Sequence, residues 1–418
     1  MTQDEWSKLS IKAGKVFTPA APVDERDLFA GRIEELVQVL DVVNQKGQHA
    51  IIFGERGVGK TSLANIVVTI CGTNLLAVRK NCDSSDDYSN LWDKVFSEIV
   101  LTQESKKPGF IANDAFEYKA VCDRDDKITP ETVRKVLTKI ATSKPLIILD
   151  EFDRISQSET RAAVADTIKT LSDHATPATI ILVGVADSVN DLIKEHLSIE
   201  RALVQIKMPR MSNSELEDLL ERGLKILKLT IEPDARHHIT LLCQGLPHYA
   251  HLLALHSVRQ AVQSHSKKIA LQHVEAAISK ALEQAQRTIQ SAYHEAITSP
   301  RKDTIFAQVL LACALTQTDE LGYFFAADVS LPLSAIMGKN YEVPGFSRHL
   351  NDFCDPDRGP ILTKIGKIRR YRFRFTNPLM QPFVVMQGFK AGLIDKHLLE
   401  SIKADSPPKT KSGRRKTN

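Results

Sequence analysis

Short apolar runs alternate with amphipathic segments through the first half of the sequence. The runs cover residues 50–53, 75–79, 146–149, 179–184 and 202–208. Apolar runs of this length are typical of strands that are buried on both faces of a parallel sheet. The segments between the runs carry apolar residues at helical spacing, as in residues 33–44. The pattern therefore predicts an α/β core in which helices cover a parallel sheet.

The pattern becomes helical after Met211. Ser212 and Glu215 form a capping box that opens the first helix of this region. Helices are expected over residues 215–227, 234–242, 248–264 and 270–296. Further on, an apolar helix over residues 305–315, two weaker helical stretches and a hairpin over residues 360–375 follow one another in the order of a winged helix.

These changes of pattern predict five segments. The first is a polar arm with two prolines and little periodicity, and the last is a basic tail that is expected to be disordered. The segments are an N-terminal arm (1–27), an α/β core (28–210), an all-helical lid (211–298), a winged-helix domain (299–402) and the tail (403–418).

Composition places the chain among ordinary globular proteins, with 43% apolar and 25% charged residues. No apolar run approaches the roughly 18 residues of a membrane span, and the N-terminus lacks the apolar segment of a signal peptide. The six cysteines form no C-x-x-C pair. Reduced thiols and a cytoplasmic location are therefore expected, rather than a disulfide framework or a zinc site.

Charge is distributed unevenly along the chain. From Ile361 to the C-terminus there are 14 Lys and Arg against 3 Asp and Glu, a net charge of +11, whereas the remaining residues carry 41 against 48, a net charge of −7. A basic C-terminal region on an acidic body indicates contact with a polyanion.

The most specific motif is G-x-x-x-x-G-K-T, which lies between an apolar run and a helix-like segment and has the form of a phosphate-binding loop. Its residues are Gly54, Glu55, Arg56, Gly57, Val58, Gly59, Lys60 and Thr61, and Ser62 follows. The glycines let the backbone N–H groups point inward, and the helix that follows adds the positive end of its dipole. Lys60 is expected to contact the β- and γ-phosphates of ATP, and the Thr61 hydroxyl is expected to bind Mg²⁺.

Two carboxylates follow the apolar run at residues 146–149. Asp150 and Glu151 would lie at the carboxyl edge of the parallel sheet, where such sheets bind their ligands. Asp150 is the candidate for the Mg²⁺ shell, and Glu151 is the candidate base that polarises the attacking water.

Two further positions are candidates for nucleotide contacts. Asp187 follows the apolar run at residues 179–184, where a polar side chain can touch the γ-phosphate and the attacking water, although it can equally cap a helix over residues 188–192. Phe29, Gly31 and residues 19–23 are expected to approach the adenine base, and the alternative is an ordinary helix start.

The hairpin carries alternating basic and aromatic residues. Arg370, Arg372 and Arg374 are expected on one face of the strand, and the aromatic residues at 371, 373 and 375 on the other face, in the core. Lys364 and Lys367 lie near the turn. This basic face suits contacts with the phosphates of double-stranded DNA that do not read its sequence. The alternative is a solvated basic face that packs on an acidic partner domain.

Taken together, the motifs resemble those of the AAA+ ATPases, and within them the branch of origin-recognition initiators, transposition ATPases and STAND signalling ATPases. The resemblance covers about residues 28–298 and rests on residues 29–32, 54–61, 149–153, 198–201 and 245–247. It implies an AAA+ parallel-sheet ATPase core, a helical lid and a C-terminal winged helix.

The resemblance also implies roles for single residues. Lys60 and Thr61 would bind phosphate and Mg²⁺, Asp150 would hold Mg²⁺ and Glu151 would be the catalytic base. Arg201 resembles the arginine finger that reaches the nucleotide of a neighbouring subunit in a homo-oligomer. The alternative for Arg201 is a structural ion pair.

Two departures from the AAA+ pattern affect the expected rate. Asp187 stands where most members place Asn, and His248, directly after Pro247, stands where initiators place an arginine that senses the nucleotide. Both departures leave ATP binding intact and favour slow turnover, as in a switch rather than a motor. His248 and His251 lie one helical turn apart, and a satisfied pair on one helix face is favoured over a metal site because no further ligand lies at suitable spacing.

Two hypotheses follow. The first is a cytoplasmic ATP-dependent switch that assembles through ATP at subunit interfaces and acts on DNA, in initiator-like loading, transposition targeting or anti-phage defence. The second is a STAND-like signalling protein that clamps ADP and whose output is an effector protein. A remodelling motor is not favoured because the sequence has no evident pore loop with an aromatic residue flanked by glycines.

Overall fold

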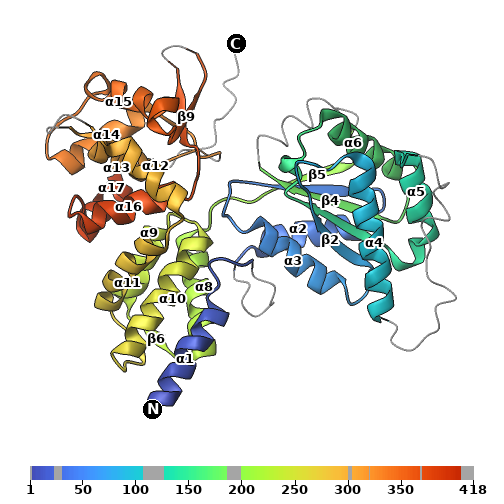
Figure 1. The fold of residues 1–418 in the computed structure, drawn as a ribbon, viewed down its shortest axis with the longest axis horizontal. Helices are drawn as coiled ribbons and strands as arrows, with labels where there is room; N and C mark the ends of the chain where they lie inside the picture. The colour runs from blue at the N-terminus through green and yellow to red at the C-terminus, as the bar shows by residue number, and fades with distance from the viewer. Residues whose placement is uncertain are drawn as a thin grey trace, which may run out of the picture. The chain divides into compact units, whose positions relative to one another are not determined.

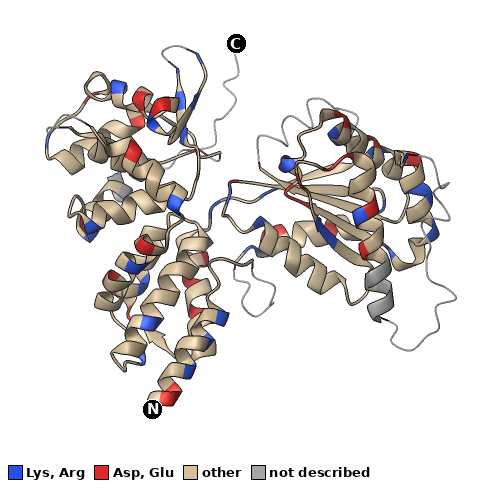
Figure 2. Cartoon of the chain, in the orientation of Figure 1, with Lys and Arg blue, Asp and Glu red and all other residues tan. Residues whose placement is uncertain are grey.

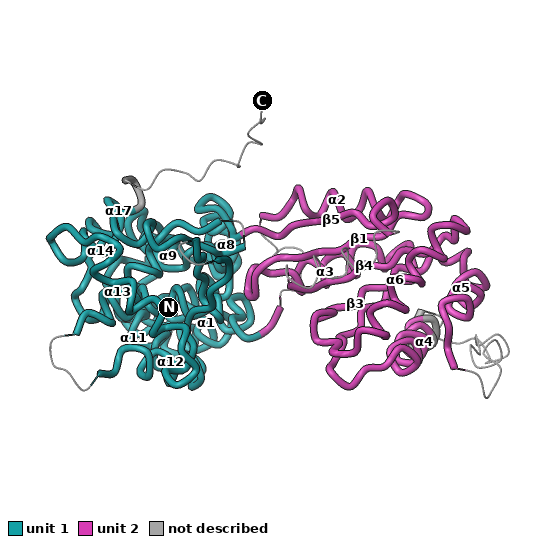
Figure 3. Tube along the Cα trace, turned by 90° about the horizontal axis from the view of Figure 1, so that it is seen from above, with its two compact units in different colours: residues 1–20, 210–418 teal, residues 21–209 magenta. Residues whose placement is uncertain are grey.

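The computed structural model describes residues 2–22, 31–106, 127–185, 199–299, 304–319, 321–367 and 370–405. The chain divides into two compact units (Figure 3). Unit 1 comprises residues 1–20 and 210–418, and unit 2 comprises residues 21–209. The two units are described separately. No helix of the described segments is long and apolar enough to cross a membrane.

Unit 2 contains a five-stranded parallel sheet with the strand order β2-β3-β4-β1-β5. The strands are β1 (His49–Phe53), β2 (Ala77–Asn81), β3 (Leu146–Asp150), β4 (Thr179–Gly184) and β5 (Leu203–Lys207). Every residue of β3 and β4 is buried, which explains why these strands read as unbroken apolar runs. The predicted α/β core with a parallel sheet is therefore confirmed.

Helices cover both faces of this sheet, as Figure 1 shows. They are α2 (Ile33–Asn44), α3 (Lys60–Cys71), α4 (Tyr88–Lys106), α5 (Pro130–Lys139) and α6 (Ser158–Asp173). Helices α2 and α3 pack together against the sheet, whereas α4, α5 and α6 form one hydrophobic core with Ile147, Leu149, Ile180 and Leu182. Residues 148 and 150 alternate with 147 and 149 along β3 and therefore face the side of α3.

The helical part of unit 1 is built from α8 (Asn213–Leu227), α9 (Pro233–Cys243), α10 (Pro247–Gln263), α11 (Leu271–Gln284) and α12 (Arg287–Ile297). The predicted capping box is present, since Ser212 and Glu215 each accept a hydrogen bond from the backbone N–H of the other. One expected helix was wrong, because residues 270–296 form two helices. Ala285 and Gln286 are not helical, and the Gln290 side chain donates to the Ala285 carbonyl at 3.0 Å.

The N-terminal segment differs from its prediction. Instead of an arm with little periodicity, residues 3–16 form helix α1 (Gln3–Val16), which buries Trp6, Leu9, Ala13 and Val16 and packs on α8 and α10. Phe17 lies against Gly223 of α8 so closely that a Cβ added to the glycine would be 2.4 Å from the ring. Residues 1–20 of the predicted arm therefore belong to unit 1.

The described rest of unit 1 begins with a helix, a short strand and two further helices. The two strands of the hairpin follow, and two helices come after them. In order, they are α13 (Phe306–Leu315), β8 (Phe324–Phe325), α14 (Ala326–Met337), α15 (Ser347–Asp352), β9 (Leu362–Ile365), β10 (Arg372–Phe375), α16 (Met380–Lys390) and α17 (Lys396–Asp405). The three strands form an antiparallel sheet with the order β8-β10-β9. The predicted hairpin is thus present, while α16 and α17 were not predicted, and α17 extends three residues into the expected tail.

Candidate nucleotide site

The loop between β1 and α3 has the backbone that its glycines predict. Gly57 and Gly59 adopt positive φ angles of 86° and 97°, which side chains with a Cβ rarely reach. Gly54 has another reason to be glycine, because an added Cβ would lie 2.3 Å from the Met208 carbonyl oxygen at the end of β5. The loop opens the 12-residue helix α3, so its N–H groups and the helix dipole together suit an anion.

Lys60, the lysine of this motif, lies folded over the loop. Its Nζ donates to the Gly54 carbonyl at 3.0 Å and to the Glu55 carbonyl at 2.8 Å. Burial lowers the pKa of Lys60 to about 8, and the nearby carboxylates of Asp153 and Asp150 oppose this shift. The side chain therefore remains mostly protonated at neutral pH and carries the charge that a phosphate requires.

Asp150 ends β3 and is almost fully buried, with 2% of its surface exposed. Its Oδ1 accepts the Glu151 N–H at 2.9 Å, and its Oδ2 accepts from Arg79 Nη1 at 2.9 Å. Burial raises the pKa of Asp150, while the hydrogen bond from the Glu151 N–H, the Arg79 charge and the nearby Thr61 hydroxyl oppose the rise. The two predicted metal-binding residues thus lie near each other, and their carboxylate and hydroxyl oxygens are ligands that fit Mg²⁺.

Glu151, the predicted base, is exposed and has a positive φ angle of 56°. Such a conformation costs a residue other than glycine about 1–3 kcal/mol. The turn that follows is fixed by Asp153, whose Oδ1 accepts the Val185 N–H at 3.1 Å at the end of β4. Arg154 in the same turn donates to Glu151 Oε2 at 2.9 Å. The sequence analysis did not identify this partner of Glu151.

Arg32 is a second arginine whose role the sequence did not predict. It follows Gly31, and both residues have left-handed φ angles, 65° for Gly31 and 58° for Arg32. The buried Arg32 guanidinium donates to the Val58 carbonyl of the loop at 3.4 Å and to the Pro209 carbonyl. It therefore ties the start of α2 to the phosphate-binding loop. The only sequence signal was its place in the motif at residues 29–32.

Several predicted nucleotide contacts stay predictions. Phe29 and Asp187 lie outside the described residues. Arg201 is exposed in the turn before β5, and none of the ion pairs recorded among the described residues involves it. The expected contacts of Gly31 and residues 19–23 with an adenine base are likewise untested.

The lid residues Pro247 and His248 lie in the first turn of α10 in unit 1. The Nδ1 atom of His248 is 2.8 Å from the Pro19 carbonyl oxygen, and burial lowers the pKa of this histidine. The neutral ring can donate this bond from Nδ1, so the chain itself supplies a partner for the residue that was predicted to sense the nucleotide. Among the described residues, no group of three or more His, Cys, Asp or Glu side chains could hold a metal ion.

Basic residues lie on the β9–β10 hairpin (Figure 2), but they differ in their partners. Arg372 pairs with Asp319 at 3.0 Å, and Arg372 and Arg374 both lie over the Tyr323 ring. Lys364 donates to the Asn351 side chain at 2.9 Å. Lys367 and Arg370 are exposed.

The predicted alternation along β10 is confirmed in part. Phe373 and Phe375 are buried, while the aromatic residue at 371 is only partly buried. The register pairs Phe373 with Lys364 and Arg372 with Ile365, so Lys364 shares a sheet face with Phe373 rather than with the arginines. Arg372 and Arg374 thus lie on the opposite strand face from Phe373 and Phe375, as predicted, but they are half-buried and pack on Tyr323.

Comparisons with known proteins agree with this architecture. A family model described as an AAA domain matches residues 43–193. The Walker-type ATPase of Pyrococcus abyssi has a similar structure, with a TM-score of 0.54 and 16% sequence identity over 88% of this chain and 99% of that chain. The ORC1 protein of Aeropyrum pernix in complex with DNA gives a TM-score of 0.44 at 13% identity over 91% of this chain and 97% of that chain. The ORC2 protein of the same organism gives 0.46 at 16% identity over 93% and 98%.

No curated protein matches the sequence significantly. The family model matches most of unit 2, and the Pyrococcus abyssi structure shares the fold over most of this chain. The predicted AAA+ α/β core with a parallel sheet, followed by a helical region, is therefore confirmed.

Proposed function

We propose that this chain binds ATP with Mg²⁺, hydrolyses it slowly and uses the nucleotide as a switch. The observation that carries this proposal is the lysine folded over a glycine-rich loop, on the side of the sheet where the buried Asp150 carboxylate and the Thr61 hydroxyl lie near each other. Loop N–H groups, the α3 dipole and Lys60 supply the positive charge that a triphosphate needs.

The residues of the site divide the chemistry among them. A phosphate in the loop would draw Lys60 away from the Gly54 and Glu55 carbonyls that it now contacts. Thr61 and Asp150 would hold Mg²⁺, which when bound neutralises the charge that develops on the phosphates. Glu151 would orient the attacking water and accept its proton.

Slow turnover is supported by two contacts that restrain the residues expected to act. Glu151 is paired with Arg154, and His248 is bonded to Pro19. Arg154 holds one of the two carboxylate oxygens of Glu151, and His248 would have to leave the Pro19 carbonyl before its Nδ1 could contact a nucleotide.

We further propose that residues 304–402 form a winged helix that contacts DNA. The order α13, β8, α14, α15, β9 and β10, with β10 between the other two strands, supports this assignment. The exposed Lys367 and Arg370 at the hairpin turn and the net charge of +11 from Ile361 onward support phosphate contacts. Arg201, exposed on unit 2, is proposed to act on the nucleotide of a neighbouring subunit.

The alternative function, a STAND-like switch that signals to a protein partner, is favoured by a different observation. The lid is joined to the C-terminal helices by a hydrogen bond from the Tyr249 hydroxyl to the Leu379 carbonyl at 2.7 Å and by an ion pair of Lys396 with Asp234 at 3.1 Å. These contacts make the lid and the C-terminal region one compact unit. Such a unit can report the nucleotide to a partner protein without DNA.

The test of the enzymatic proposal compares two variants. Lys60→Ala is expected to abolish binding of ATP, whereas Glu151→Gln is expected to keep binding and to lower turnover about 100- to 10,000-fold. Normal hydrolysis by Glu151→Gln would remove Glu151 from its proposed role.

A second experiment separates the output to DNA from the output to a partner protein, by identifying the bound nucleotide and the oligomeric state of the purified protein. ATP-driven assembly on duplex DNA supports the output to DNA. Tightly held ADP in a monomer supports the output to a partner protein.

A further inference from the structure

Arg79 is the residue whose position carries an inference beyond the proposed reaction. It lies on β2 and is paired with Ile148 in the parallel register, two positions before Asn81 meets Asp150. Its Nη1 is 2.9 Å from Asp150 Oδ2, and the exposed fractions of the two side chains are 25% for Arg79 and 3% for Asp150. A cationic side chain thus occupies one oxygen of the buried carboxylate that is proposed to hold Mg²⁺.

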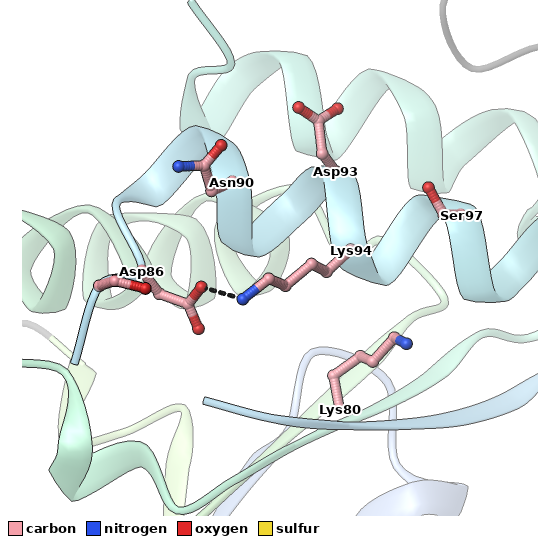
Figure 4. Close-up of a pocket in the computed structure, with 7 residues that line it drawn as sticks. Lys80, Asp86, Asn90, Asp93, Lys94 and Ser97 are labelled. Atoms are coloured by element: carbon pink, nitrogen blue, oxygen red, sulfur yellow. Dashed lines mark hydrogen bonds and ion pairs between the residues drawn. The ribbon is translucent and has the colours of Figure 1, made fainter. Parts of the chain in front are cut away.

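The strand period places Arg79 on this side of the sheet. Its neighbour Lys80 points the other way and pairs with Glu98 of α4 at 2.6 Å. Figure 4 shows Lys80 at an open pocket that is also lined by Lys94 of α4, which is paired with Asp86. The two adjacent cations of β2 therefore lie on opposite faces of the sheet. Of the two, only Arg79 lies on the face of Asp150.

The hydrogen bonds of Asp150 leave little room for a further cation. Oδ1 already accepts the Glu151 N–H, and Arg79 holds Oδ2. Among the described residues, Arg79 is the only side chain that forms an ion pair with Asp150. Arg79 therefore compensates a buried charge that would otherwise be costly.

We propose that Arg79 is a positioning residue that competes with Mg²⁺ for Asp150. A divalent cation bound at Thr61 and Asp150 repels the guanidinium and needs the oxygen that the guanidinium holds. Arg79 therefore raises the Mg²⁺ concentration that the nucleotide complex requires and keeps the empty site ordered. This inference rests on the proposed binding of ATP and Mg²⁺.

The test measures how strongly metal and nucleotide binding are coupled. Arg79→Met removes the charge and keeps the length of the side chain. Its affinity for a fluorescent ADP analogue is measured in EDTA and in saturating MgCl₂, and Mn²⁺ binding to the ADP complex is followed by electron paramagnetic resonance. The affinity in MgCl₂ divided by the affinity in EDTA is expected to be at least about fivefold larger in Arg79→Met than in the wild type. Half-saturation of the ADP complex with Mn²⁺ is expected at a correspondingly lower Mn²⁺ concentration.

Two controls separate competition from general damage. Arg79→Lys keeps a cation at this position and is expected to restore wild-type metal coupling, and Lys80→Met removes a charge from the adjacent residue and is expected to leave the coupling unchanged. Without nucleotide, Arg79→Met is expected to melt at a lower temperature than the wild type and to regain stability with Mg²⁺ and ADP. If Arg79→Met does not fold, Arg79→Gln provides the same comparison.

The outcomes are distinct. A metal coupling in Arg79→Met that equals or falls below the wild-type value, while the wild type binds nucleotide, overturns the competition and leaves the proposed ATPase intact. Equal coupling in Arg79→Met and Lys80→Met overturns it as well. A wild-type protein that binds no nucleotide in either buffer overturns both the proposed function and this inference.

Discussion

Glu151 Oε2 accepts a hydrogen bond from Arg154 Nη1 at 2.9 Å, three residues further along the chain. Both side chains are about half exposed, with 47% and 54% of their surfaces accessible. An exposed ion pair of this kind contributes little to stability. The pair matters because it engages the Glu151 carboxylate, which is the proposed base for the attacking water.

Removing this partner should increase turnover. In Arg154→Met, both carboxylate oxygens of Glu151 are free of the ion pair, and turnover is expected to rise about two- to fivefold. The measurement is steady-state ATP hydrolysis at saturating Mg²⁺. Arg134→Met, which removes the arginine of another i, i+3 pair, with Glu131 on α5, is the matched control and should not change the rate. A fall in turnover in Arg154→Met would instead assign Arg154 a supporting role in catalysis.

DNA binding should depend on the exposed basic residues of the hairpin turn. The double variant Lys367→Gln/Arg370→Gln is expected to weaken duplex binding and to reduce the slope of log affinity against log salt by about 1.8, since each phosphate contact contributes about 0.9. These two residues are better targets than Arg372, whose pairing with Asp319 and stacking on Tyr323 also support the fold.

The control for this experiment removes two exposed lysines elsewhere in unit 1, in Lys225→Gln/Lys390→Gln. It has the same change of net charge and should retain the wild-type slope. Equal slopes in both double variants would mean that the hairpin turn does not contact the phosphates, and would favour the output to a protein partner.

The fold was predictable because its signals are local. Buried parallel strands such as β3 read as apolar runs, and the phosphate-binding loop and Asp150-Glu151 are motifs with fixed spacing. The proximity of Thr61 to Asp150 follows from that topology. Arg79 and Arg154 were missed because the strand period and the helix period assign a residue to a face but not to a partner, and Arg79 is 71 residues from Asp150.

Two errors in the helices have equally physical causes. Helix α1 does have a periodic apolar face at Trp6, Leu9, Ala13 and Val16, but the polar residues between them and the prolines that follow favoured an arm. The break between α11 and α12 carries neither glycine nor proline, and the Gln290 side chain satisfies the carbonyls that end α11. A side-chain cap of this kind leaves little signal in the sequence.

The attachment of α1 can be tested with a pair of glycine substitutions. Gly223→Ala places a methyl group 2.4 Å from the Phe17 ring, so it should displace Phe17 and loosen α1 at a cost of about 1–3 kcal/mol. Gly14→Ala, within α1 itself, meets only the end of the Arg259 side chain at 3.7 Å and should stabilise the helix by about 0.5–1 kcal/mol. Hydrogen exchange of residues 3–16 should accelerate in the first variant and slow in the second. Unchanged exchange in Gly223→Ala would show that the ring can shift without releasing the helix.

Acid should destabilise unit 2 through His49 at the start of β1. This histidine is fully buried, its Nδ1 accepts the Ile180 N–H at 3.0 Å, and burial lowers its pKa to about 4. The unfolded chain, with a histidine pKa of about 6.5, binds a proton that the folded protein excludes, so stability falls as the pH drops from about 6.5 towards 4. At pH 5 the expected loss is about 2 kcal/mol relative to neutral pH.

His49→Gln keeps an acceptor for the Ile180 N–H but cannot be protonated in this range. Its melting temperature at pH 7 should be lower than that of the wild type, because a buried side chain is replaced, yet the further decrease between pH 7 and pH 5 should be smaller. His174→Gln, which changes an exposed histidine of the same unit, should retain the wild-type decrease. Since β1 leads directly into the phosphate-binding loop, nucleotide affinity should fall together with stability in the wild type at pH 5, and less so in His49→Gln. Parallel pH profiles for the wild type and His49→Gln would assign the acid sensitivity to other buried groups.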